Sequence, residues 1–374
     1  MITEVNSLRK LKSFVYFVKD LYKECEHYIY PSFYIVLKEL KKEVLLEKKS
    51  KAILMYEDDN LKGRLLYTFK FNPKTSKMVC YFSYLDVVDD QKVFDELFEY
   101  MENDMVKNRI FYSEGTFSPF DPDNRRGILI KGFDDDPVVF TSYNYPYYGK
   151  LLESFGYGKI HDTVSLQPVI SEDNERKLNS LVKMFNRRFD VEVSCLDIKN
   201  IDSELEDVHK IIQVATTDVI YQEAPSLELI KKVAKSLKPL IRTEIVIIAR
   251  ERLTKEPIGF ALCLLDFNQI FKITKGKLKI LKFLKAKKHI NRSRAMMQYV
   301  VPKYQSTGLT IAIYDKVYAG FKKLGITSFE AGTIMEDNFK SMTSFAKFGG
   351  EVKKIYRIYG KDIVTKWLLH SRYY

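Results

Sequence analysis

The stretch Pro302-Lys303-Tyr304-Gln305-Ser306-Thr307-Gly308-Leu309-Thr310 decides how the second half of the chain is interpreted. Apolar residues before it predict a strand over 295–301, and apolar residues at helical spacing after it predict a helix over 308–324. The first N–H groups of a helix lack internal partners and lie at the positive end of its dipole. Gly308 would let phosphate oxygens approach the backbone, and the neighbouring hydroxyl groups could donate hydrogen bonds. The segment therefore predicts an anion site between a strand and a helix.

The pattern Gln305-x-x-Gly308-x-Thr310 resembles the cofactor motif of the GNAT superfamily of N-acetyltransferases, Gln/Arg-x-x-Gly-x-Gly/Ala, at the start of a helix that follows a strand. Thr310 departs from the Gly/Ala of the last position. A second predicted helix begins at Asn338, and the residues at offsets of three, seven and eleven are similar to the superfamily's second CoA-side motif. The resemblance implies that the chain binds acetyl-CoA or another acyl-CoA. The residues it implicates are Val300, Val301, Gln305, Ser306, Thr307, Gly308, Leu309, Thr310, Asn338 and Phe345.

Further segments are similar to a poorly characterised branch of tandem acetyltransferase-like proteins. These segments are Gly132-Phe133-Asp134, Pro137, Tyr143-Asn144, Tyr147-Tyr148, Asp266-Phe267-Asn268 and residues 330–338. The similarity implies two fused copies of an α/β (α+β) fold, each a mixed, largely antiparallel sheet flanked by helices. The length of 374 residues, about twice that of a common single domain, also favours two domains.

We place the domain boundary at Gln167-Pro168, before Ser171, which is followed by acidic residues and predicts a helix N-cap. Residues 1–167 would form an N-terminal GNAT-like domain with a degenerate cofactor motif, because no Gln/Arg-x-x-Gly-x-Gly/Ala precedes its helix near Asp89. Residues 168–374 would form the C-terminal GNAT domain with the acyl-CoA site.

Hydrophobic periodicity and turn residues predict the elements of both halves. In the first half we expect a helix over 14–22, an antiparallel meander of strands at 52–57, 63–71 and 78–87, a helix after Asp90, strands at 111–112 and 138–141, and a short helix within 143–155. In the second half we expect strands at 191–198, 245–250, 257–265, 295–301 and 326–333, and helices after Ser171 and at 204–219, 226–237, 308–324 and 338–348.

Composition limits the class of protein. The chain is 46% apolar and 29% charged, as in soluble globular proteins. Its four cysteines form no CxxC pair and no histidine stands at ligand spacing, so we expect neither a disulfide framework nor a metal site. The most apolar stretch, Ile258 to Leu265, is eight residues long, and a membrane-spanning helix needs about 20. We therefore expect a cytoplasmic protein with no membrane partner.

The net charge of +12 is concentrated in one segment. Residues 272–294 contain ten lysines and arginines and no acidic residue. Within this run Leu278, Leu281 and Leu284 predict the buried stripe of a helix whose other face is lysine. The interpretation we prefer is a solvated helix face, and an anion or nucleic-acid patch is the alternative.

The resemblance implies that an amine attacks the thioester directly, so a base and a proton donor for the departing thiolate are needed. The family's common donor is a tyrosine at the position of Phe345, which has no hydroxyl group. Tyr304 is our candidate donor, with Tyr314 and Tyr356 left open, and Glu330 is our candidate base, with an ion-paired structural glutamate as the alternative. Candidate substrate-binding residues are Asp266, Asn268, Tyr143 and Tyr147, which could equally belong to turns and to the core.

These observations favour an acyl-CoA-dependent N-acyltransferase that transfers an acetyl group to the primary amine of a small molecule or peptide. One alternative is a catalytically degenerate GNAT-fold protein that binds or regulates. A second alternative is a nucleic-acid-associated basic protein. The acceptor, the acyl chain length and the oligomeric state are left open by the sequence.

Overall fold

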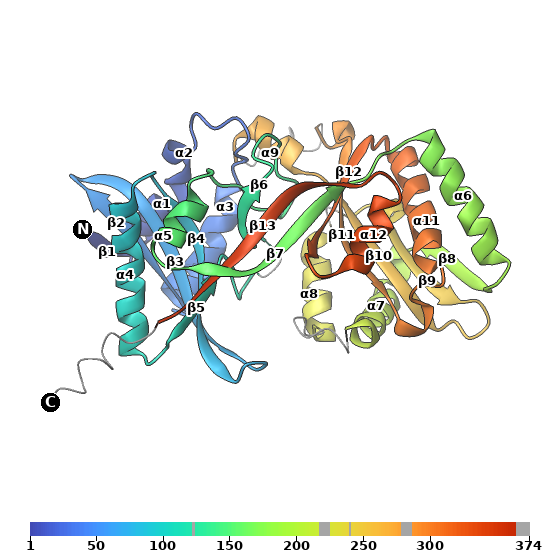
Figure 1. Cartoon of the computed structure of the whole chain (residues 1–374), viewed down its shortest axis with the longest axis horizontal. Coiled ribbons are helices and arrows are strands. Elements are labelled where there is room, and N and C mark those ends of the chain that lie inside the picture. Colours follow the sequence, from blue (N-terminus) through green and yellow to red (C-terminus); the bar gives the residue numbers. More distant parts are fainter. Residues whose placement is uncertain (122–123, 217–224, 239–240, 278–285, 364–374) are drawn as a thin grey trace.

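The computed structural model describes residues 1–121, 124–216, 225–238, 241–277 and 286–363 (Figure 1). The predicted leucine stripe at 278–284 lies outside these residues. Among the described helices, none has both the length and the apolar character that crossing a bilayer requires.

The described strands form one 13-stranded sheet in the order β1-β2-β3-β4-β5-β13-β7-β12-β11-β10-β9-β8, and β6 pairs with β13 beside this path. The strands are β1 (Ile2–Glu4), β2 (Ser50–Glu57), β3 (Asn60–Asn72), β4 (Lys77–Val87), β5 (Tyr112–Gly115), β6 (Ile128–Lys131), β7 (Gly158–Gln167), β8 (Val191–Cys195), β9 (Val246–Glu251), β10 (Pro257–Leu265), β11 (Arg292–Val300), β12 (Ser328–Met335) and β13 (Glu351–Asp362). The described pairs are antiparallel except β4–β5 and β11–β12. The fold is α/β with a largely antiparallel sheet, as predicted.

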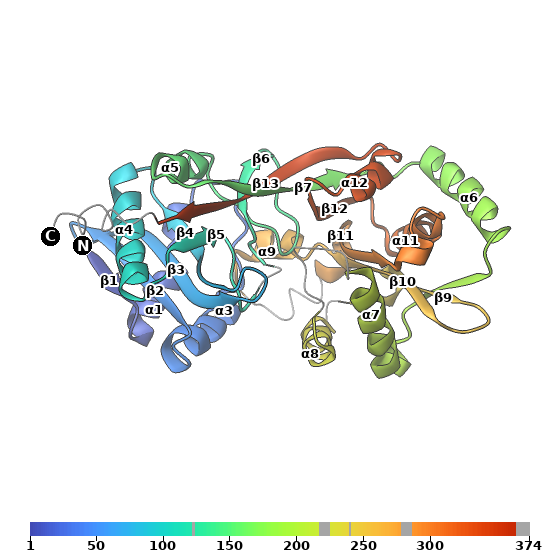
Figure 2. The same cartoon turned by 60° about the horizontal axis from the view of Figure 1, so that its bottom comes forward.

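Helices cover both sides of this sheet (Figures 1 and 2). The longer ones are α1 (Leu8–Tyr16), α3 (Phe33–Leu40), α4 (Gln91–Lys107), α6 (Glu172–Asn186), α7 (Ile201–Ala215), α8 (Leu227–Leu237), α11 (Leu309–Leu324) and α12 (Phe339–Ala346). The shorter ones are α2 (Val18–Leu21), α5 (Tyr148–Ser154), α9 (Asn268–Thr274) and the π-helical turn η1 (Lys41–Leu46). The predicted N-cap Ser171 is confirmed, because its side chain accepts from the N–H of Asn174, and Asp90 caps α4 by accepting from the N–H of Val93.

The order of elements is repeated along the chain. The first copy runs β1, α1, α3, β2, β3, β4, α4, β5, and the second runs β8, α7, α8, β9, β10, β11, α11, β12. In each copy the crossover helix, α4 or α11, joins the only two strands that pair in parallel among those described. The structure therefore contains two copies of one fold.

Two long strands, β7 and β13, join the copies into one sheet (Figure 1). They pair antiparallel from Gly158↔Gly360 to Gln167↔Glu351. The far end of β13 pairs with β5 of the first copy, while β7 pairs with β12 of the second. Neither strand is among the predicted elements. The domain boundary at Gln167-Pro168 stays a prediction, and the last strand of the chain lies among first-copy strands.

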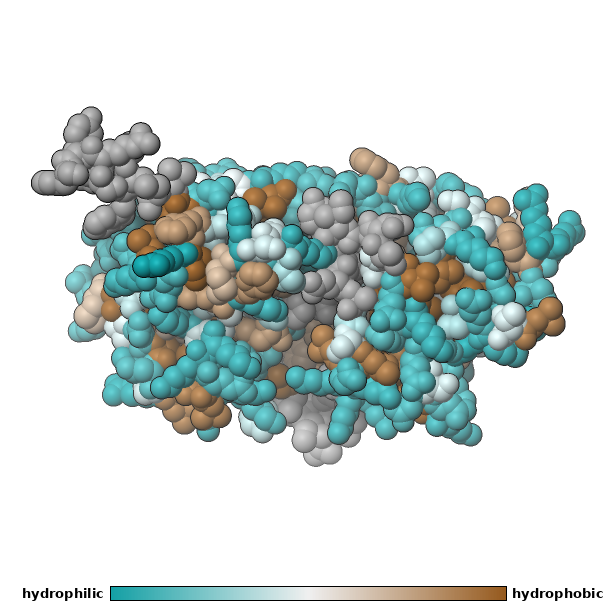
Figure 3. All heavy atoms as spheres, turned by 90° about the horizontal axis from the view of Figure 1, so that it is seen from below, coloured by the Kyte–Doolittle hydropathy of each residue, from teal (hydrophilic) through white to brown (hydrophobic). Residues whose placement is uncertain are grey.

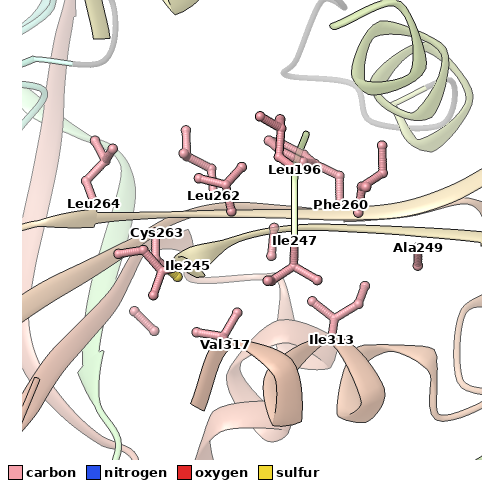
Figure 4. Close-up of a cluster of buried hydrophobic side chains, with 14 of the residues drawn as sticks. Leu196, Ile245, Ile247, Ala249, Phe260, Leu262, Cys263, Leu264, Ile313 and Val317 are labelled. Carbon is pink, nitrogen blue, oxygen red and sulfur yellow. The ribbon is translucent and has the colours of Figure 1, made fainter. Parts of the chain in front are cut away.

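Strand β10 is buried on both faces, which explains its continuous apolar sequence. Figure 4 shows Phe260, Leu262 and Leu264 on one side of the strand and Cys263 on the other, toward Ile313 and Val317 of α11. Helix α7 covers the first side. The sheet of the second copy is thus held between two layers of helices.

The predicted strand over 138–141 is wrong. The N–H of Thr141 donates to the carbonyl of Val138 in a turn, and the N–H of Val139 donates to the carboxylate of Asp266 at 2.9 Å. The apolar residues of this segment are buried against the second copy and not within a strand pair. The strand in this region is β6, which lies closer to the N-terminus than the predicted segment.

Candidate active site

Strands β11 and β12 separate halfway along their length. Their parallel pairing extends from Arg292↔Ser328 to Ala295↔Ala331. On its other edge, β11 continues pairing with β10 as far as Val300↔Gly259, with a register shift at Leu262/Cys263. A cavity of about 1290 Å³ lies at this separation and is lined by both strands, α11 and α12. The part of β11 beyond Ala295 therefore has a backbone edge that faces a cavity.

The loop that the sequence singled out borders this cavity. Gly308 is the N-cap of α11 and has φ of 104°, a left-handed conformation that favours glycine. Gln305, Ser306, Gly308 and Thr310 line the cavity. The side chain of Gln305 donates to the carbonyl of Val300 at 3.2 Å, which ties the loop to the end of β11. The positive end of the α11 dipole thus lies at the cavity wall.

A Cβ atom added at Gly308 would meet only the side chain of Phe185, at 3.4 and 3.9 Å, so no backbone atom crowds this position. An anion would meet the N-terminus of a helix there, together with the hydroxyl groups of Ser306 and Thr310. This arrangement fits the pyrophosphate of a CoA molecule.

Helix α12 supplies the opposite wall. Asn338 caps it by accepting from the N–H of Ser341 at 3.1 Å, and both Asn338 and Phe345 line the cavity. The ring of Phe345 stacks on that of Tyr314, with centroids 5.0 Å apart.

The structure brings together most of the implicated cofactor residues. Val300, Gln305, Ser306, Gly308, Thr310, Asn338 and Phe345 line the cavity. The other three do not. Val301 donates its N–H to the carbonyl of Ile258, Thr307 donates its hydroxyl to the carbonyl of Tyr304, and Leu309 is fully buried in the core.

The candidate proton donors occupy different places. The hydroxyl of Tyr304 donates to Glu251 at 2.6 Å, and Tyr304 is not part of the cavity lining. Tyr314 lines the cavity, and burial raises its pKa well above the ordinary value, although a hydrogen bond with Gln298 opposes the shift. Of the two, Tyr314 alone lines the cavity, and the sequence left it as an alternative to Tyr304.

Glu330 lies in a buried polar cluster. One of its oxygens pairs with the ammonium of Lys354, and the other accepts from Ser165 at 2.7 Å. Lys354 also donates to Asp135 at 2.7 Å. Burial alone would raise the pKa of Asp135, but Lys354 and the nearby Arg292 hold it below the ordinary value. Glu330 is not part of the cavity lining, and its environment is that of an ion-paired structural residue.

Asp266 and Asn268 connect the two copies. Asp266 is fully buried, accepts from the N–H of Val139 and forms an ion pair with Arg292 at 2.6 Å. Burial raises the pKa of Asp266, opposed by Arg292. Asn268 donates to the carbonyl of Pro137 at 2.8 Å. Neither residue lines the cavity, so the geometry gives them a role in joining the copies.

Tyr143 and Tyr147 lie in the first copy and away from the cavity lining. The hydroxyl of Tyr143 donates to the carbonyl of Phe133, and that of Tyr147 donates to the carbonyl of Val87. Tyr147 also belongs to a run of stacked rings with Tyr145 and Tyr148. Their contacts are those of core aromatic residues.

Part of the basic run is internal. Lys272 pairs with Asp136, Arg292 pairs with Asp266, and the buried Arg294 donates to the carbonyls of Gly332 and Val139. These contacts join the loop of the first copy to the second, and they use the buried Arg294, the largely buried Arg292 and the partly exposed Lys272.

Several residues that line the cavity were not predicted. They are Arg126, Phe140, Thr141 and Thr163 from the first copy, and Arg294, Met296, Met297, Phe329 and Phe348 from the second. The methionines lie within the strand predicted over 295–301, so their place on β11 was a usable signal. The first-copy residues meet the cavity only through the pairing of β7 and β13, which local periodicity does not report.

Known proteins share this architecture. The chain is 26% identical over 303 residues to a bacterial ceramide synthase of Caulobacter vibrioides, covering 78% of this chain and 77% of that protein. It is 23% identical over 299 residues to Protein YghO of Escherichia coli, covering 76% and 74%. No family model matches the chain.

Solved structures extend the comparison to nearly the whole chain. A tandem GNAT protein from the clavulanic acid biosynthesis pathway aligns with a TM-score of 0.56 and 10% identity, over 97% of this chain and 99% of that one. A GCN5-related N-acetyltransferase from Sphaerobacter thermophilus aligns with a TM-score of 0.55 and 10% identity, over 97% and 96%. This chain therefore has the fold of the GCN5-related N-acetyltransferases, present as two tandem copies.

Proposed function

We propose that the protein is an acyl-CoA-dependent N-acyltransferase whose active site is the cavity between β11 and β12. The observation that carries the proposal is the meeting of a helix N-terminus, a glycine in the left-handed conformation and the part of β11 beyond its pairing with β12, all at one cavity. A helix N-terminus suits a pyrophosphate, and a strand edge suits an amide-containing arm. Among the described residues, the N-terminus of α11 and the edge of β11 both border this cavity.

Acyl-CoA would supply the activated thioester. The chain would hold and orient this cofactor. The loop from Gln305 to Thr310 would bind the phosphates, and the β11 edge from Met296 to Val300 would bind the pantetheine arm. The hydroxyl of Tyr314, which lines the cavity, would donate its proton to the departing sulfur. Phe345 packs on the Tyr314 ring and orients it.

The lining favours an acyl group longer than acetyl. Met296, Met297, Phe329, Phe345 and Phe348 surround the cavity, and an acetyl group would leave most of this apolar surface without a partner. One relative, by its name, forms ceramide, an N-acylated lipid. We infer an acceptor that carries a primary amine on an apolar body, with a fatty acyl group as the donor and acetyl as the alternative.

Calorimetry with CoA tests the cofactor site. Gly308→Trp would place a large side chain over the phosphate position, and we expect at least about tenfold weaker binding than wild type. Gly325→Trp is the matched control, because Gly325 ends the same helix with φ of 70° and has no atom within 4 Å of an added Cβ. Equal loss in both variants, or no binding by the folded wild type, would overturn the proposal.

The catalytically degenerate alternative is favoured by Phe345, which stands where the family has its tyrosine. It predicts CoA binding without turnover. Single-turnover transfer from palmitoyl-CoA and acetyl-CoA to a long-chain amine distinguishes the two: product formation supports an enzyme, and binding without product supports a binding protein.

A further inference from the structure

The helix pairs α1/α3 and α7/α8 lie on the same side of the sheet, away from α4 and α11 (Figure 2). They occupy equivalent positions in the two copies. Figure 3 views the molecule from below, so this side lies along its lower edge, and the face that it shows carries hydrophobic side chains in small groups between hydrophilic ones. Each helix pair carries exposed apolar side chains.

The first group, which we call the α3 patch, consists of Tyr34, Ile35 and Leu46. Their exposed fractions are 66%, 54% and 68%. Exposed lysines flank the patch along α3 and η1, at positions 38, 41, 42, 48 and 49, and two of them, Lys42 and Lys49, pair with Glu47 at 3.3 and 2.7 Å. Phe33, Val36 and Leu40 are buried and pack α3 on the core. The exposed residues of the patch are therefore not needed for this packing.

The second group, the α8 patch, consists of Leu229 and Val233, which are 46% and 38% exposed. They lie four residues apart and so share one edge of α8. Lys232 and Lys235 are exposed beside them, while Lys231 turns toward Asp202 and Glu206 of α7, at 3.6 and 3.8 Å. The helix is amphipathic, with Ile230 packed on the core and lysines on the polar face.

We propose that this side of the molecule docks on the surface of an anionic lipid bilayer. Aliphatic side chains bordered by lysines are the composition of helices that lie in the membrane interface. The net charge of +12 gives a favourable long-range attraction to anionic headgroups. Two such patches on one side, one from each copy, suit a flat partner.

A shallow groove on α1 adds a place for a headgroup. It has a volume of about 500 Å³ and is lined by Leu8, Arg9, Lys12, Ser13 and Tyr16. Two cations beside aliphatic and aromatic surface match a phosphate on an acyl chain. The earlier expectation of no membrane partner concerned spanning segments, and lying on a bilayer requires none.

A nucleic acid is the less favoured partner. Its backbone would use the lysines but would gain nothing from exposed Ile35, Leu46, Leu229 and Val233. Single-strand binding usually adds stacking aromatic residues, and of these patch residues Tyr34 alone is aromatic. The apolar members therefore favour the bilayer.

Co-sedimentation with vesicles tests the proposal with the full chain. The probes are vesicles of phosphatidylglycerol and phosphatidylcholine, and vesicles of phosphatidylcholine alone. We expect binding to the anionic vesicles that weakens with added salt, and a loss of at least about tenfold in Ile35→Glu/Leu46→Glu and in Leu229→Glu/Val233→Glu.

Met184→Glu/Leu253→Glu is the matched control. Met184 lies on α6 and Leu253 in the β9–β10 turn, with exposed fractions of 53% and 88%. Circular dichroism verifies that all variants are folded. The control must keep wild-type binding. The proposal is overturned if wild type does not bind, if control and patch variants lose binding equally, or if only lysine charge reversal matters and duplex DNA displaces the vesicles.

The outcome is independent of the acyltransfer proposal. The patches share no residue with the cavity lining. The protein could therefore bind vesicles without binding CoA, or bind CoA without binding vesicles.

Discussion

Lys354 and Glu330 form an ion pair inside the sheet, between the last strand of the chain and β12. Lys354 is fully buried and also donates to Asp135 of the first copy, so its ammonium joins three segments distant in sequence. Taking such charges out of water costs several kcal/mol per ion, which the pairing must offset. Removing one partner alone would therefore leave the other charge buried and uncompensated.

Lys354→Met leaves Glu330 without its ion-pair partner and Asp135 with Arg292 alone, and we expect the free energy of unfolding to fall by about 3–5 kcal/mol. Urea denaturation measures the free energy of unfolding of each variant. Lys353→Met, at the half-buried neighbouring position, should change stability by no more than about 0.5 kcal/mol. Adding Glu330→Gln to Lys354→Met should restore part of the loss, because the amide oxygen can still accept from Ser165. Equal effects at 353 and 354 would show that the pair contributes nothing.

Tyr314→Phe removes the hydroxyl that we assign to proton donation and keeps the ring that stacks on Phe345. We expect the rate of acyl transfer to fall by about 10²-fold, with CoA affinity unchanged within about twofold. Single-turnover kinetics and calorimetry measure these separately. Tyr304→Phe is the comparison and should leave the rate near wild type, since its hydroxyl lies at Glu251. A larger loss of rate in Tyr304→Phe than in Tyr314→Phe would instead assign proton donation to Tyr304.

Glu39 on α3 should make stability depend on pH. Burial and the nearby Asp121 raise its pKa from 4.5 to about 7. The folded state therefore binds the proton more tightly than the unfolded state, so its stabilising contribution is complete below about pH 4.5 and is lost as the pH rises through about 7.

Glu39→Gln removes this dependence. The melting temperatures of variant and wild type should agree at pH 5 and differ at pH 8, where the variant is the more stable. Glu47→Gln serves as the control, because hydrogen bonding by Lys49 lowers the pKa of Glu47 and the substitution should give no gain at pH 8. A variant no more stable than wild type at pH 8 would contradict the assignment.

Residues 1–167 expressed alone should not form a stable domain. In the whole chain β5, β6 and β7 all pair with β13, and β7 also pairs with β12. The fragment lacks β12 and β13, so all of these strand edges would be open. We expect aggregation, or a spectrum without cooperative thermal unfolding. A cooperative, monomeric fragment would instead show that the boundary at 167 separates independently folding units.

Local sequence determined much of this protein. The apolar run of β10, the caps Asp90 and Ser171, and the glycine that begins α11 each depend on neighbours a few residues away. Such signals are set by backbone geometry and burial of one face, and both can be read from spacing. The cavity-lining loop from Gln305 to Thr310 belongs to this class.

The tertiary structure decided how the two copies are joined and which candidate residues reach the cavity. Strands β7 and β13 pair across a separation of nearly 200 residues, from Gly158↔Gly360 to Gln167↔Glu351, and periodicity carries no information about such partners. The same joining explains why Glu330 and Asp266 became buried ion pairs and why Val138–Thr141 is not a strand. The sequence does not reveal whether a carboxylate forms an ion pair with a cation on a distant strand. Only the fold therefore distinguishes a structural charge from a catalytic one.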